Sequence, residues 1–122
     1  MDINKNSGQV EIIGPYGRVY LYTHNDASCL VNDVHSALSL RVRWNDPDYL
    51  AKIVFCRMVP LEGWHNDFGY GIGTQLYADV NLLITLDTVK QIITLQSATD
   101  MNYKFNMSFE EFMLDFLGQA NI

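Results

Sequence analysis

The sequence predicts an α+β domain with a mainly antiparallel sheet of about five strands and three helices, in the order ββααβββα. Two observations predict it: strand-like alternation around two turns, and apolar residues at helical spacing in three segments. A chain of 122 residues that is 48% hydrophobic and 18% charged fits one globular domain. Residues 1–8 are polar and are expected to form a flexible leader, which leaves 9–122 as the domain.

The first hairpin is predicted from residues 9–14 and 18–24, which flank Gly14-Pro15-Tyr16-Gly17. Pro15 has the φ angle that the second position of a type I turn requires. In the second strand an aliphatic face (Val19, Leu21, Thr23) alternates with an aromatic and polar face (Arg18, Tyr20, Tyr22). We expect helices to cover at least one face of the sheet.

The second hairpin is predicted from residues 81–86 and 91–96, which are joined by 87–90. Both strands carry apolar residues on both faces, so they are expected to be central and covered. A further strand is expected at about 72–78, after a bend or bulge in the glycine-rich segment 69–73.

Three helices are predicted from their start and stop signals. Asn25, Asp26 and Ser28 provide capping oxygens for a helix over about 28–41. The signals for the two later helices are more complete. One helix is expected to begin at Asp46-Pro47-Asp48 and to stop at Pro60. The other is expected to begin at the capping box of Ser108 and Glu111 and to stop at Gly118.

The net charge of −6 limits the classes of partner. An acidic chain is repelled by phosphate backbones and anionic membranes, so we expect no nucleic acid and no membrane partner. No apolar run approaches the ~18 residues of a membrane span, and the N-terminus has no signal-peptide pattern. Cys29 and Cys56 form no CxxC pair and are expected to be free, buried residues. We expect a cytoplasmic protein.

Residues 21–38, LYTHNDASCLVNDVHSAL, collect much of the ionisable chemistry where a strand becomes a helix. His24 near Cys29 at a helix start has the parts of a thiol nucleophile, because an imidazole and a helix N-terminus favour the thiolate. No cysteine-enzyme signature surrounds Cys29, so a capping junction is the favoured interpretation. We assign no catalytic residue and keep a small Cys/His hydrolase as an alternative.

Metal-ligating residue types are present without a metal-binding spacing. His24, His35 and His65 have Asp26, Asp33 and Asp67 nearby, and imidazole with carboxylate suits zinc. The chain has no HxH, HxxxH or CxxC pattern. His35 lies at helical spacing beside Val31 and Leu38, which favours a hydrogen-bonded core histidine. We expect no metal and no cofactor.

Aromatic residues are frequent in the segments between the predicted elements, where they favour interfaces and ligand pockets. Tyr20, Tyr22 and Tyr77 belong to this aromatic set, and the whole set is equally explained as lids over the core. We expect the working surface at loop 61–73 and turn 24–28. The predicted binding residues are His24, Asp26, Trp44, Trp64, His65, Phe68 and Tyr70.

Four segments together resemble a group of small, mostly uncharacterised bacterial and phage-borne proteins: residues 19–26 (VYLYTHND), 43–51 (RWNDPDYLA), 69–73 (GYGIG) and 108–112 (SFEEF). In that group a strand ends in a Tyr-Thr-His-Trp-Gly-Gly-like or His-Trp-Asp-Gly-like motif, and the resemblance spans most of residues 18–117. Asn25 stands where the group usually has tryptophan, and Ala27 where it usually has glycine. His24 is therefore the residue carried over from the motif. The resemblance implies a phage or prophage setting and brings no known activity.

We expect a non-enzymatic binding protein, encoded by a phage or mobile element, that blocks a host factor of the defence type or sequesters a small ligand. The alternatives are an acidic, immunity-type inhibitor of a basic toxin and the Cys/His hydrolase. The expected partner is a host protein or a small molecule, and a homo-oligomer stays open.

Overall fold

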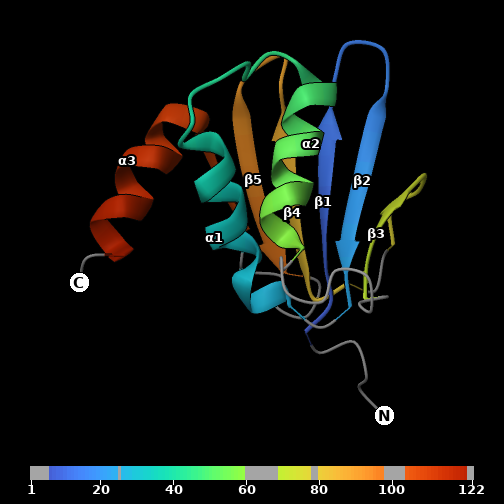
Figure 1. Ribbon diagram of the computed structural model, residues 1–122. Coiled ribbons are helices and arrows are strands. Elements are labelled where there is room, and N and C mark those ends of the chain that lie inside the picture. The colour runs from blue at the N-terminus through green and yellow to red at the C-terminus, as the bar shows by residue number, and fades with distance from the viewer. Residues whose placement is uncertain (1–5, 25, 60–68, 78–79, 98–103, 121–122) are drawn as a thin grey trace.

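The computed structural model describes residues 6–24, 26–59, 69–77, 80–97 and 104–120 (Figure 1). Within them, six strands form one sheet in the order β3-β2-β1-β4-β5-β6. The strands are β1 (Gly8–Ile13), β2 (Arg18–Thr23), β3 (Tyr70–Gly73), β4 (Leu82–Asp87), β5 (Ile92–Ser97) and β6 (Lys104–Ser108). Neighbouring strands are antiparallel except β1 and β4, which run parallel.

The α+β class is confirmed, while the predicted sheet differs in two details. The sheet is mixed because β1 and β4 are parallel, and it has six strands in the described residues where about five were expected. The missed strand is β6, an edge strand that pairs only with β5 and runs directly into a helix. The element order is therefore ββααββββα.

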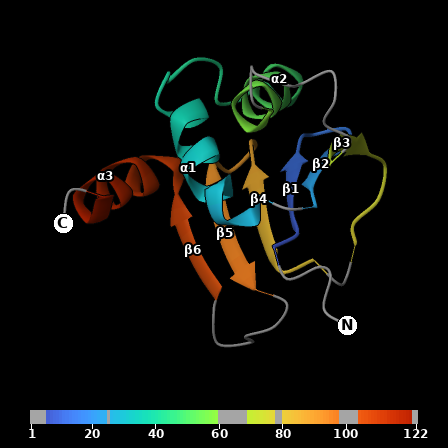
Figure 2. The ribbon, with the colours of Figure 1, turned by 60° about the horizontal axis from the view of Figure 1, so that its bottom comes forward.

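Three helices cover one face of the sheet in the part of the chain that the structure describes (Figures 1 and 2). Helices α1 (Ala27–Leu38) and α2 (Pro47–Met58) pack against each other, and α3 (Phe109–Ala120) contacts α1, β5 and β6. The opposite face of the sheet has no helix from these residues. Side chains that alternate with the core residues along β1 and β2 therefore point away from the helices.

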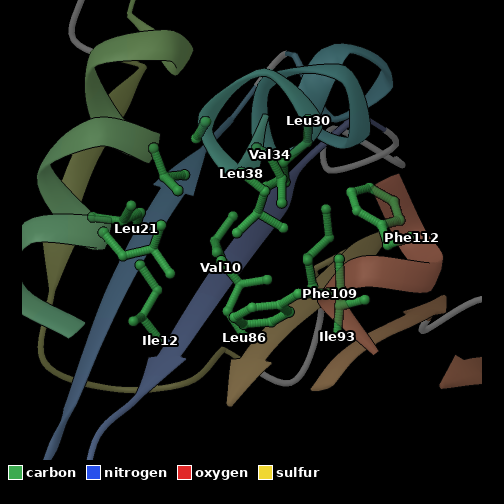
Figure 3. Packing of buried hydrophobic residues seen from close by; sticks show 14 of the residues in the cluster. Val10, Ile12, Leu21, Leu30, Val34, Leu38, Leu86, Ile93, Phe109 and Phe112 are labelled. Carbon is green, nitrogen blue, oxygen red and sulfur yellow. The ribbon is translucent and has the colours of Figure 1, made fainter. Parts of the chain in front are cut away.

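The core lies between this helical layer and the sheet (Figure 3). It contains Val10, Ile12, Leu21, Leu86 and Ile93 from the strands, Leu30, Val34 and Leu38 from α1, and Phe109 and Phe112 from α3, all at most 1% exposed. Complete burial of such side chains stabilises the fold by about 1.5–3 kcal/mol each. The aliphatic face predicted for β2 is the one that α2 covers.

Both predicted hairpins are confirmed. The Gly14 N–H donates to the Gly17 carbonyl at 2.9 Å across the first turn. In the second turn one carboxylate oxygen of Asp87 accepts from the N–H groups of Val89 and Lys90 at 3.0 Å. Cover on both faces was expected here and is wrong for β5, because Ile92 remains 36% exposed on the side without helices.

The starts of α2 and α3 are confirmed by their hydrogen bonds. Asp46 Oδ1 accepts from the Tyr49 N–H at 3.1 Å, with Pro47 in the first turn. Ser108 and Glu111 form the reciprocal capping box at 3.0 and 2.9 Å. Two predicted ends, however, are wrong. Helix α3 continues past Gly118 to Ala120, and α1 ends at Leu38 because Arg41 and Arg43 have φ angles of 53° and 55°, outside helical geometry.

The start of α1 is capped by a distant residue. The Asn6 backbone carbonyl accepts from the Ala27 N–H at 2.8 Å, and Asn6 Oδ1 accepts from the Ser28 N–H at 3.2 Å. Asp26 makes no side-chain cap bond. The predicted capping role of Asp26 and Ser28 is therefore wrong, and Asn25 lies outside the described residues. Although the leader was expected to span 1–8, Asn6 belongs to the fold and β1 begins at Gly8; residues 1–5 are not described.

Candidate functional site

Pairing between β2 and β3 builds the base of the candidate site. Tyr22 lies opposite Gly71 in the register, and the His24 N–H donates to the Gly69 carbonyl at 2.8 Å beyond the strand end. The Tyr22 ring lies so close to Gly71 that a Cβ at that position would overlap it. The expected strand at 72–78 is therefore shifted to Tyr70–Gly73, and the glycine-rich segment is a strand and not a bend.

A cavity of about 210 Å³ opens beside Tyr22, where β1 begins and β2 ends. It is lined by Ser7, Gly8, Tyr22, Thr23, His24, Tyr77 and Val80, and we call it the Tyr22 pocket. Tyr22 and His24 are two positions apart and alternate with the buried Thr23, so both side chains lie on the side of the sheet without helices.

Three aromatic rings meet in the Tyr22 pocket. The ring centroids of Tyr22 and His24 are 5.1 Å apart with an interplanar angle of 58°. Those of Tyr22 and Tyr77 are 6.4 Å apart at 83°. His24 is exposed and Tyr77 is 39% exposed, so the rings are accessible from solvent.

A buried amide holds Tyr77 in place. Gln9, which is fully buried, lies opposite Tyr22 in the β1–β2 register. Its Nε2 donates to the Gln75 carbonyl at 2.8 Å, and its Oε1 accepts from the Tyr77 N–H at 2.9 Å. The amide thus bonds to the chain segment that follows β3, as a neighbouring strand would. Because both contacts are made by the backbone of that segment, they fix the main chain at Tyr77 beside the pocket.

Asp26 and Tyr70, two of the predicted binding residues, lie together next to the Tyr22 pocket. The Tyr70 hydroxyl donates to the Asp26 carboxylate, which joins the start of β3 to the start of α1. The Asp26 N–H donates to Thr23 Oγ1 at 3.1 Å, and Thr23 lines the pocket. Asp26 and Tyr70 therefore border the site without lining it, whereas His24 does line it.

Trp44 was predicted as a binding residue and lies elsewhere. It belongs to the connection between α1 and α2, at the end of the sheet opposite the end of β2 (Figure 1). Its Nε1 donates to the Leu38 carbonyl at 3.0 Å, and its ring packs edge-on against Phe109 at 5.5 Å. These contacts make Trp44 part of the packing, so its assignment to the site is wrong. The other three predictions, Trp64, His65 and Phe68, fall outside the described residues.

Neither cysteine has the predicted burial. Cys29 and Cys56 are free and exposed, because both lie on outward faces of their helices. Within the described residues no hydrogen bond joins Cys29 to His24. No group of three or more His, Cys, Asp or Glu able to hold a metal ion occurs in that part of the chain.

His35 is a core histidine, as predicted. It is 8% exposed, its Nε2 lies 3.4 Å from the Met113 carbonyl oxygen, and its ring packs against Phe112 at 5.5 Å. On the same helix, burial and then the nearby charge of Asp26 raise the pKa of Asp33 to about 6. Neither residue lines the Tyr22 pocket.

Tyr22, Tyr77 and Gln9 were absent from the predicted set of binding residues. The alternation along β2 places Tyr22 beside His24 and was a usable signal. Gln9 and Tyr77 are 68 positions apart, and no local pattern links them.

No helix of the described residues is both long and apolar enough to cross a membrane. No protein family, curated protein or solved structure matches the chain in the comparisons made.

Proposed function

We propose that the protein is a non-enzymatic binding protein that engages its partner through the Tyr22 pocket. The observation that carries the proposal is the arrangement of three accessible aromatic rings around one cavity. Aromatic side chains in pockets are the commonest anchors of interfaces, since they bury large areas and lose little rotamer entropy. The Gln9 bonds to residues 75 and 77 add preorganisation, which lowers the ordering cost of binding.

A protein is the favoured partner because apolar surface continues beyond the pocket. Leu76, next to Tyr77, is 46% exposed. A pocket beside such a side chain suits an interface with one inserted anchor and apolar contact at its border. The resemblance to phage-borne proteins supports a host protein of the defence type as the partner. The protein would block this partner by occupying its surface.

An acidic, immunity-type inhibitor of a basic toxin is the second candidate, favoured by the net charge of −6. Its partner would carry a basic surface, and association would be steered by charge over the whole molecule. The two candidates differ in salt dependence. An interface anchored in the Tyr22 pocket keeps most of its affinity as salt rises, whereas charge-steered binding to a toxin weakens steeply.

The test is affinity capture from host lysate with three forms of the full chain: the unaltered protein, Tyr77→Asp and Tyr16→Asp. Tyr16 is fully exposed in the β1–β2 turn, at the far end of these strands from the pocket, and serves as the matched control. The proposal predicts that one protein is retained by the unaltered chain and by Tyr16→Asp, and is lost with Tyr77→Asp. The proposal is contradicted if Tyr77→Asp retains the same protein as the unaltered chain, or if no protein is retained above background. Circular dichroism of each variant confirms that the fold is kept.

A further inference from the structure

We propose that the Tyr22 pocket binds a cationic side chain of the partner protein between the rings of Tyr22, His24 and Tyr77. The inference rests on the proposed function and names the chemical group that is recognised.

The rings supply the attraction. The face of an aromatic ring is negative and attracts lysine, arginine or alkylammonium cations within about 6 Å of the centroid. Tyr22 and Tyr77 are inclined at 83°, and Tyr22 and His24 at 58°, so the walls of the pocket face in different directions. Rings set at steep angles surround a compact cation better than parallel rings would, because several faces reach it together.

The charge around the pocket favours the same sign of ligand. Among the residues that the structure describes, its lining contains neither lysine nor arginine. The whole chain carries a charge of −6. An anion would meet this field without a lysine or arginine among the described lining residues to neutralise it, whereas a cation is desolvated against the rings.

The size of the pocket selects one side chain. Pockets for drug-sized ligands have volumes of roughly 300–1,000 Å³. The Tyr22 pocket has about 210 Å³. It therefore suits a single inserted group, with the exposed Leu76 left to contact the surrounding partner surface.

Two probes of the same shape separate charge from apolar contact. Choline carries a trimethylammonium group, and 3,3-dimethylbutan-1-ol carries the uncharged tert-butyl group in its place. Both are titrated into the full chain and followed by the NMR signals of the His24 and Tyr77 rings. We expect choline to bind about tenfold more tightly, which corresponds to about 1.4 kcal/mol. Equal affinities, tighter binding of the alcohol, or no binding of choline would overturn the proposal.

Variants of Tyr77 locate the effect. Tyr77→Phe keeps an aromatic face and should retain choline affinity within about twofold, whereas Tyr77→Leu should lose most of the preference over the alcohol. Tyr16→Leu, at the far turn, should change nothing. A preference that survives Tyr77→Leu unchanged would place the cation elsewhere and overturn the assignment. Acetylated amides of lysine, trimethyllysine and arginine then identify the preferred side chain.

The result is separable from the proposed function. If choline fails while partner capture still depends on Tyr77, the pocket binds a partner by apolar contact, and only the cation is wrong. If choline binds but no captured protein depends on Tyr77, the pocket takes a free small cation, and the protein partner is wrong.

Discussion

The ring of Tyr22 on β2 covers Gly71 on the adjacent strand β3, where any side chain would overlap it. The same ring is the shared neighbour of His24 and Tyr77 in the pocket. Gly73, two residues further along β3, lies opposite Tyr20 and has no atom within 4 Å of the place where a Cβ would be. One glycine of β3 is thus required by the position of Tyr22, and the other is not.

Gly71→Ala should displace the Tyr22 ring. We expect the free energy of unfolding to fall by about 1–3 kcal/mol, the usual cost of overpacking, and choline binding to weaken at least about tenfold. Gly73→Ala is the matched control. Its folded state should be unchanged or slightly stabilised, because the unfolded chain has a smaller conformational entropy. Urea unfolding and the NMR titration measure both effects. Equal behaviour of the two variants would show that Gly71 does not position the ring.

Asn6→Ala should destabilise the start of α1. The substitution removes the oxygen that accepts from the Ser28 N–H, and loss of a side-chain cap costs about 1 kcal/mol. Asn32→Ala, on an exposed position of the same helix, removes an amide without removing a cap and should be neutral or slightly stabilising. Thermal unfolding of both variants checks this. If Asn6→Ala is as stable as the unaltered chain, Asn6 is not the cap.

Asp33→Asn should stabilise the protein in a pH-dependent way. Burial and the charge of Asp26 raise the pKa of Asp33 from 3.8 to about 6. The folded state therefore holds the proton more tightly than the unfolded state. The resulting stability is complete below about pH 4 and is lost as the pH rises through about 6. Removing the charge should add about 1 kcal/mol at about pH 8, after discounting for partial exposure, and almost nothing at about pH 4.

The control for this prediction is Asp48→Asn, because Asp48 is an exposed carboxylate in the first turn of α2. It should give no gain at either pH, since an anion is favourable at a helix start. Urea unfolding at both pH values provides the comparison. A gain from Asp33→Asn that is the same at both values would contradict the raised pKa.

Cys29 should react as an ordinary exposed thiol. Both cysteines are free and exposed, so each should be alkylated in the folded protein without denaturant. We expect Cys29 and Cys56 to react at similar rates at neutral pH, as followed by mass spectrometry of single-cysteine variants. A Cys29 that reacts many times faster than Cys56, and slows when His24 is replaced by Gln, would revive the hydrolase alternative.

Features of the fold that depend on neighbouring residues were predictable from the sequence. The start of α2 and the capping box of α3 are made by groups within three positions of each other, so the residue types at these positions predict both helix starts. The two hairpins are likewise set by their turns. The core face of β2 followed from alternation alone.

Features made by distant residues were not predictable. The parallel pairing of β1 with β4 has no local sequence signal in either strand. The cap of α1 comes from Asn6, which lies 22 positions before Ser28. The site has the same character. His24 and Asp26 were found because they lie in one turn, whereas Tyr77 reaches the pocket through Gln9, 68 positions away. Trp44 was misassigned because a partly buried aromatic that closes a core has the same sequence signal as one that binds a ligand.

The most direct measurement of the central claim is the set of nuclear Overhauser contacts between the methyl protons of bound choline and the ring protons of the full chain. We expect contacts to Tyr22, His24 and Tyr77 together, and none to Tyr16 at the far turn. Contacts to other residues only, or to a single ring on the surface, would show that these side chains do not form one binding site.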